Sequence, residues 1–145
     1  ACWEGHVECA QLLRGAGADI DQAMDDGCTP LFVACQKGHV GIARLLRESS
    51  AAVNQAKENG VTPLFIACET GQLECVQLLL EAGAAVSQAK ENGATPLLIA
   101  SEEGHLECVQ LLLEAGAAID QAHENGVTPL YVACQNDQLD CARLL

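Results

Sequence analysis

Apolar residues occur in short clusters along the chain, and each pair of clusters is followed by a polar stretch that contains glycine. Within residues 62–94 the first cluster is PLFIAC and the second is CVQLLLEA. Their apolar positions fall on one side of a helix, which predicts one helix over about 63–70 and another from Leu73 to a stop at Gly83. The rest of the unit, AAVSQAKENGA, carries an Asn-Gly turn pair and predicts an extended, hairpin-like connection.

This pattern repeats with a period of 33 residues. All four prolines follow a threonine, and the Thr-Pro pairs begin at positions 29, 62, 95 and 128. A threonine before a proline predicts a helix N-cap followed by the first helical position. Helices this short are not stable alone, so the units are expected to stack and bury their apolar faces against each other.

The repeat register predicts a single domain over residues 1–145. It contains three complete units between two partial ones, with the boundaries 1–28, 29–61, 62–94, 95–127 and 128–145. Both partial units are cut within a helix and neither has a polar cap, so we expect a piece of a longer array. Apolar residues near the two ends, such as Leu12 and Leu144, are then incompletely covered.

The unit resembles the ankyrin repeat. The resemblance is carried by TPLFIAC, the glycine that follows it, and CVQLLLEAGAAV, and it extends over essentially the whole chain. It implies an all-α solenoid of stacked helix-turn-helix units with projecting β-hairpin-like loops. It also implies binding of other proteins through the loop tips and the inner face of the first helices, without a common catalytic activity.

Two positions depart from the family pattern in every copy. The histidine after Thr-Pro-Leu is replaced, and apolar packing is expected to stand in for its polar network; the replacements are Phe32, Phe65, Leu98 and Tyr131. The acidic residue that opens the loop turn is also replaced, by Met24, Lys57, Lys90 and His123.

The unit 29–61 is the least regular. Gly41 lowers the helix propensity of its second helix by about 1 kcal/mol. Ser50 stands where other units have a stop glycine, and a non-glycine residue with positive φ is strained. We therefore expect this unit to be the least stable one in the interior of the stack. Asp137 also replaces a glycine, but aspartate tolerates the left-handed region better.

Composition narrows the class of partner. The chain has seven basic and twenty acidic residues, a net charge of −13 and only 3% aromatic residues. This balance disfavours nucleic acid and anionic membranes as partners and favours a basic protein or peptide. The nine cysteines are odd in number, which favours a reducing intracellular compartment, the cytoplasm with a nuclear location left open.

Chemistry-bearing residues have structural explanations. Most cysteines recur at one place in each helix, as small buried apolar residues do; Cys28, in a loop tip, is expected to be the most reactive thiol. A metal site built from Cys2, His6 and Cys9 is disfavoured because other units lack one member or another. Cysteines within a unit, such as Cys68 and Cys75, are candidates for oxidation across the turn.

Histidines at the starts of second helices, such as His39 and His105, are expected to have a structural role. No catalytic motif or phosphate loop is apparent, so we expect no enzyme activity, no cofactor, no metal and no small-molecule substrate.

The expected partner site comprises the loop tips and the ends of the first helices, which have no predicted core role. These positions are Asp25, Asp26, Gln36, Lys37, Glu58, Asn59, Val61, Glu69, Thr70, Glu91, Asn92, Glu102, Glu103, Glu124, Asn125, Val127, Gln135 and Asn136. They predict a mostly acidic groove that binds an extended basic segment of a protein. Two alternatives stay open: a structural or regulatory arm of a larger multidomain protein, or a recently copied array without a tuned partner.

Overall fold

A computed structural model describes residues 5–145 of the chain. Its regular elements in that range are all helices, and no strand occurs there. The helices are α1 (Val7–Gly15), α2 (Pro30–Lys37), α3 (Val40–Glu48), α4 (Pro63–Glu69), α5 (Leu73–Glu81), α6 (Pro96–Glu103), α7 (Leu106–Glu114), α8 (Pro129–Gln135) and α9 (Leu139–Leu144). The prediction of an all-α repeat stack is therefore confirmed.

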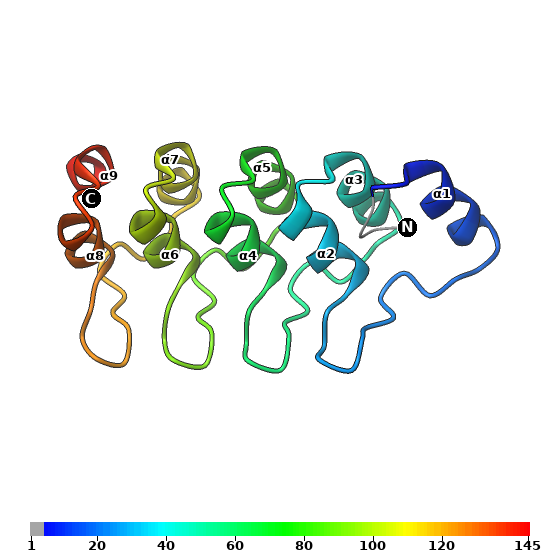
Figure 1. The fold of residues 1–145 in the computed structure, drawn as a ribbon, viewed down its shortest axis with the longest axis horizontal. Coiled ribbons are helices and arrows are strands. Elements are labelled where there is room, and N and C mark those ends of the chain that lie inside the picture. The colour runs from blue at the N-terminus through cyan, green and yellow to red at the C-terminus, as the bar shows by residue number, and fades with distance from the viewer. Residues whose placement is uncertain (1–4) are drawn as a thin grey trace.

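The helices form two rows in an elongated stack (Figure 1). The first helices of the units, α2, α4, α6 and α8, make one row, and the second helices make the other. The loops that enter the first helices project to one side as long fingers. Each finger closes in a hairpin-like turn, in which the Gly60 N–H donates to the Lys57 carbonyl at 2.9 Å and the Lys57 N–H donates to the Val61 carbonyl at 3.0 Å.

The Thr-Pro pairs begin the first helices as predicted. Thr62 has an extended backbone, and its side-chain oxygen accepts a hydrogen bond from the Phe65 N–H at 3.1 Å, while Pro63 occupies the first helical position. The same N-cap bond occurs at Thr29, Thr95 and Thr128. Each cap satisfies one of the backbone donors that a helix start leaves without a partner.

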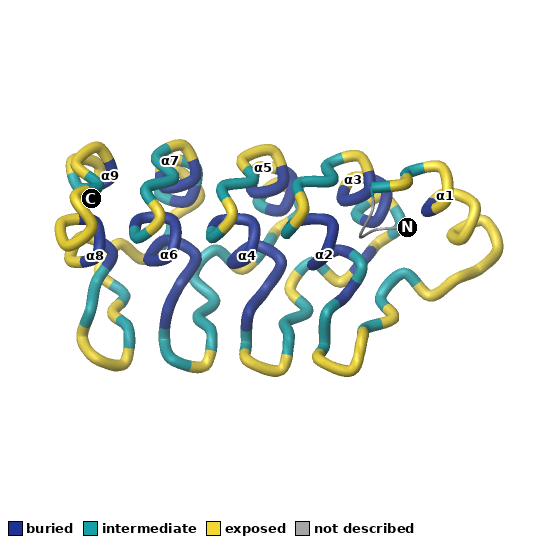
Figure 2. The backbone as a smooth tube through the Cα atoms, in the orientation of Figure 1, coloured by how far each residue is buried: buried dark blue, intermediate teal, exposed yellow. Residues whose placement is uncertain are grey.

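The core runs continuously between the two rows (Figure 2). Leu64 and Leu79 are almost completely buried in one unit, and the small residue Ala67 has no exposed surface. Every interior unit places an alanine at the Ala67 position, which lets the helices approach closely.

Hydrogen bonds between units were not foreseen from the sequence. A side chain in each loop accepts a bond from the backbone of the next unit: Asp21 from the Ala52 N–H at 3.0 Å, and Asn54 from the Ala85 N–H at 2.8 Å. Ser87 accepts the equivalent bond at 2.9 Å. These bonds join residues 31 positions apart and fix the register of neighbouring loops.

The helix-start histidine has a structural role, as expected, but not as a cap. His105 makes no side-chain cap bond to its own helix. Instead its Nε2 atom lies 3.2 Å from the Glu69 carbonyl oxygen of the preceding unit. The ring lies over Gly71, where an added Cβ would come within 2.6 Å of it. The residue therefore links neighbouring units.

The irregular unit carries the predicted strain. Ser50 has a φ of 66°, in the left-handed region that its glycine counterpart Gly83 occupies with a φ of 80°. Asp137 is the second non-glycine residue with positive φ, at 57°. Gly41 has a packing reason, because an added Cβ would lie 3.3 Å from the Val7 Cγ2 atom. Glycine there permits the approach of α1 to α3.

Replacing Ser50 with glycine is expected to raise the free energy of unfolding by about 1 kcal/mol, because the left-handed conformation costs an L-residue about that much. Urea unfolding measures the change. The control is Ala82→Gly in the next unit, where φ is −83°. There glycine relieves no strain and is expected to destabilise by about 0.5–1 kcal/mol. A destabilising Ser50→Gly would contradict the assignment of strain.

Candidate functional site

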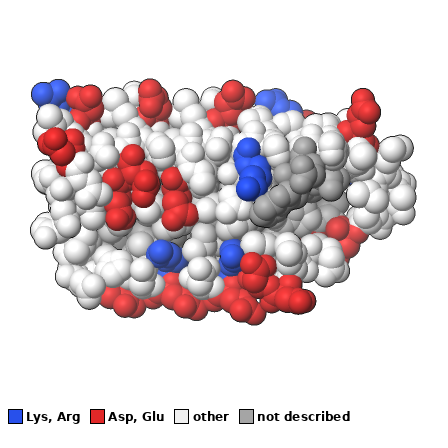
Figure 3. Space-filling model, in the orientation of Figure 1, with Lys and Arg blue, Asp and Glu red and all other residues white. Residues whose placement is uncertain are grey.

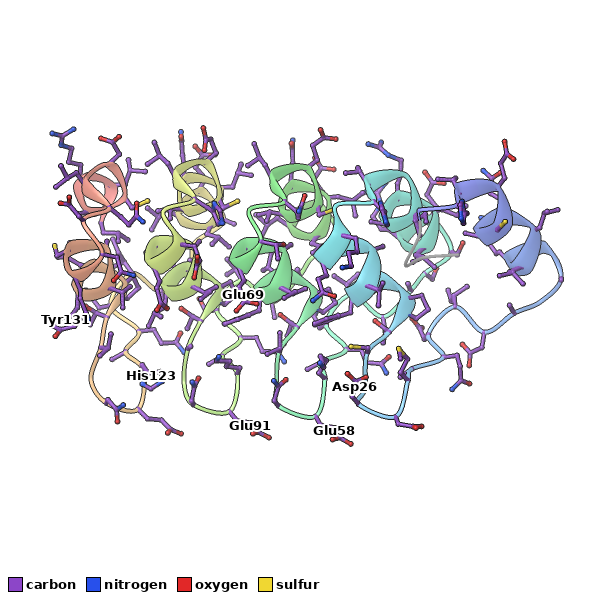
Figure 4. The ribbon with its side chains drawn as sticks, viewed as in Figure 1. Asp26, Glu58, Glu69, Glu91, His123 and Tyr131 are labelled. Atoms are coloured by element: carbon purple, nitrogen blue, oxygen red, sulfur yellow. The ribbon has the colours of Figure 1, made fainter. Side chains whose placement is uncertain are left out.

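Most of the predicted partner residues belong to two rows, one at the loop tips and one at the ends of the first helices. Figure 4 shows Glu58 and Glu91 at the tips of neighbouring loops and Glu69 nearer the helices. The turn places Glu58 and Asn59 at the end of its finger, and both are exposed. The tip row therefore repeats one acidic position per unit.

Backbone hydrogen bonds between loops set the spacing of this row. The Glu91 N–H donates to the Asn59 carbonyl at 3.2 Å, and the Glu124 N–H donates to the Asn92 carbonyl at 3.1 Å. The carboxylates of Glu58, Glu91 and Glu124 form no hydrogen bond or ion pair within residues 5–145. These three groups are available to a ligand at regular intervals.

The second row is formed by the ends of the first helices. Glu69 ends α4, and Glu102 and Glu103 end α6. Lys37 ends α2, so the row becomes basic toward the N-terminal side. In Figure 3 acidic side chains gather near the middle of this face and along its lower edge, with two basic groups between them.

Two lysines separate the acidic rows and cover aromatic rings. The Lys57 Nζ atom lies 3.0 Å from the Asp26 carboxylate and 5.5 Å from the centre of the Phe32 ring. The Lys90 Nζ atom lies 5.2 Å from the Phe65 ring centre. Each such contact contributes about 0.5–1 kcal/mol at an exposed site. The aromatic residue after Thr-Pro-Leu and the lysine at the loop turn both depart from the family pattern. Each aromatic ring packs against the lysine of the next loop along the chain.

Asp26 is the tip acid most strongly held by its surroundings. The Cys28 backbone N–H, 3.0 Å from Oδ1, and the Lys57 ammonium lower the pKa of the Asp26 carboxyl to about 2. Since the folded pKa lies below the ordinary value of 3.8, this contribution to stability is present above that value and is lost as pH falls toward 2. Asp26 stays charged throughout the neutral range.

Cys28 lies beside this carboxylate. Partial burial, and then the hydrogen bond of its thiol to Asp26 at 3.2 Å, raise the pKa of Cys28. An activated cysteine needs a lowered pKa, so these surroundings oppose the expectation that Cys28 is the most reactive thiol.

Three of the predicted site residues have structural roles within the fold. Val61 is only 7% exposed and belongs to the core, so the prediction that it has no core role is wrong; Val127 is partly exposed. The Thr70 hydroxyl donates to the Ile66 carbonyl at 2.8 Å. The Asn136 side chain donates to the Glu102 carbonyl at 3.1 Å and so links α8 to α6.

The cysteines are mostly core residues, as expected. Five are buried: Cys35, Cys68, Cys75, Cys108 and Cys141. The prediction is wrong for Cys9 and Cys134, which are exposed in the outermost described units. Cys2 lies outside the described residues. Within residues 5–145 no group of three potential ligands is placed to hold a metal ion.

Thiols of neighbouring units contact each other. A hydrogen bond with Cys75, together with burial, holds the pKa of Cys35 well above its usual range. This contact joins a first-helix cysteine to the second helix of the next unit. Cys108 accordingly contributes to the raised pKa of Cys68, after burial. The proximity of Cys68 and Cys75 within one unit stays a prediction.

The comparisons agree with the geometry. A family model of ankyrin repeats, in three copies, matches residues 1–90 and residues 83–145. No curated protein matches the chain. Among residues 5–145 no helix has the length and apolar content needed to cross a bilayer. Ankyrin repeats are generally protein–protein interaction modules and typically not enzymes. The chain belongs to the ankyrin-repeat family.

Proposed function

We propose that the chain is a scaffold that binds an extended basic segment of a partner protein along the face formed by the loop tips and first-helix ends. The observation that carries this proposal is the row of unpaired carboxylates on Glu58, Glu91 and Glu124. An acidic group at every unit offers the same contact repeatedly, which suits a ligand that runs along the stack.

The charge balance of the face supports the same class of partner. Its predicted positions include eight carboxylates, while Lys37, Lys57 and Lys90 are the lysines on it. Lys57 is already paired with Asp26. The carboxylates of Glu58, Glu91 and Glu124 have no partner within residues 5–145, so they attract a basic segment over a distance of about the Debye length, ~8 Å at physiological salt.

A fluorescent arginine- and lysine-rich peptide serves as the test ligand, with binding followed by anisotropy at low and physiological salt. Changing Glu58, Glu91 and Glu124 together to glutamine is expected to weaken binding at low salt by about tenfold or more, because direct charge contacts are lost. Binding by the unchanged protein is expected to weaken as salt is raised.

The matched control makes the same charge change on the second-helix row: Glu74, Glu107 and Glu114 to glutamine. These residues lie on α5 and α7 and are exposed. This variant is expected to lose at most about twofold, since it changes only the long-range field. Equal losses in both variants, or binding insensitive to salt, would contradict the proposed face.

A further inference from the structure

Three loop tips contain an Asn-Gly step, at Asn59, Asn92 and Asn125. Asparagine before glycine is prone to deamidation because glycine lacks a side chain that hinders attack by its backbone nitrogen. That nitrogen loses its proton and bonds to the asparagine Cγ, and ammonia leaves. Water then opens the resulting succinimide to aspartate or isoaspartate. The side chain must rotate toward the glycine nitrogen first, so its freedom controls the rate.

Asn59 and Asn92 are each held by two hydrogen bonds. The Asn59 Oδ1 atom accepts from the Val61 N–H at 3.3 Å, and its carbonyl accepts from the Glu91 N–H at 3.2 Å. Asn92 accepts in the same way from the Ala94 N–H at 3.1 Å and from the Glu124 N–H at 3.1 Å. Rotation of either side chain requires its Oδ1 bond to open, while the carbonyl bond only holds the backbone of the step.

The Asn125 side chain lacks this restraint. Within the described part of the chain its side chain forms no hydrogen bond, and its backbone N–H donates to the His123 Nδ1 atom at 3.2 Å.

We propose that Asn125–Gly126 is a deamidation site of this chain, and that the fold protects the two other Asn-Gly steps. The rate difference arises from the folded structure, because the residues flanking the three steps are nearly identical. Glutamate precedes each asparagine, and valine or alanine follows each glycine.

The aspartate product fits the turn. The first loop carries Asp26-Gly27 at the corresponding position, and the Asp26 Oδ1 atom accepts the Cys28 N–H at 3.0 Å. Aspartate at position 125 is therefore compatible with the turn geometry, and it adds a negative charge beside Glu124 on the tip row. The isoaspartate product lengthens the backbone by one methylene and has no such precedent in the chain.

The test incubates the folded 145-residue chain in mildly alkaline buffer at body temperature. Samples are digested at acidic pH, and fragment-ion mass spectrometry assigns deamidation to each asparagine. Asn125 is expected to react about tenfold faster than Asn59 and Asn92, since a side-chain hydrogen bond must open at each protected site. The same chain unfolded in urea is expected to show three rates within about threefold of each other.

Two results would overturn the proposal. One is a native rate at Asn59 or Asn92 equal to that at Asn125. The other is an advantage of Asn125 that persists in urea, which would place its cause in the local sequence. The variant Asn125→Gln should remove most of the mass change of the native protein, and circular dichroism checks that it remains folded.

Discussion

Replacing Phe65 with alanine is expected to lower the free energy of unfolding by about 3–5 kcal/mol. The ring is 1% exposed and lies in the core cluster beneath the Lys90 ammonium. Helices α4 and α6 on either side of this joint are fixed by their N-caps and by loop hydrogen bonds, so the space left by the ring is not expected to close. Urea unfolding followed by circular dichroism measures the loss as a lower midpoint at an unchanged m-value.

Tyr131 provides the matched control, because it occupies the same position in the last described unit. It is 57% exposed, and its replacement by alanine is expected to cost less than about 1 kcal/mol. Phe65→Leu separates volume from ring chemistry. Leu98 at the equivalent position is 4% exposed, so leucine fits, and a loss of about 1 kcal/mol is expected. Equal losses for Phe65→Ala and Tyr131→Ala would show that the packing of Phe65 between neighbouring units contributes little to the free energy of unfolding.

The helices were predictable because their boundaries depend on neighbouring residues. The first helix of the unit 62–94 was predicted over about 63–70 from Thr62 and Gly71, and it spans Pro63–Glu69. The second begins at Leu73, as predicted, and ends at Glu81, before Gly83. Capping and left-handed termination act within a few residues, so the local sequence contains the information.

Contacts between units were not predictable in the same way. Asn54 accepts a bond from a backbone group 31 residues later, but its sequence position looks like any polar loop residue. Cys75 was associated with Cys68 because they are close in sequence, whereas its hydrogen-bonding partner is Cys35. Val61 follows a turn glycine and resembles an exposed loop residue, yet it packs into the core.

The candidate site was predictable only in part. The tip acids were located from the repeat and the turn, and the structure places them in one row. The lysine–aromatic contacts were missed, although a signal exists in the sequence. Both phenylalanines are followed in the next loop by lysine, as in Phe32 with Lys57 and Phe65 with Lys90, while leucine is followed by His123. The pairing of phenylalanine with a lysine in the next loop is therefore visible in the way the two positions change together from unit to unit.

Replacing Gly60 with alanine is expected to lower the free energy of unfolding by about 2–4 kcal/mol. Two costs combine. Gly60 has a φ of 79°, where an L-residue is strained by about 1–2 kcal/mol. An added Cβ would also lie 3.0 Å from the Glu91 nitrogen and 3.1 Å from the Lys90 Cα atom, which belong to the backbone of the next loop. Relief requires the two loops to separate.

The variant Gly126→Ala carries only the cost of backbone strain. Its difference from Gly60→Ala therefore gives the cost of the contact with the next loop. Gly126 has nearly the same φ, 77°, but an added Cβ there meets nothing within 4 Å. Its replacement is expected to cost only about 1–2 kcal/mol. Urea unfolding of both variants gives the difference, and hydrogen exchange of the Glu91 amide reports whether its bond to the Asn59 carbonyl opens in Gly60→Ala. Similar losses in the two variants would mean that the loops do not stack closely. The spacing of the tip carboxylates would then be adjustable, and an extended ligand would have to impose that spacing when it binds.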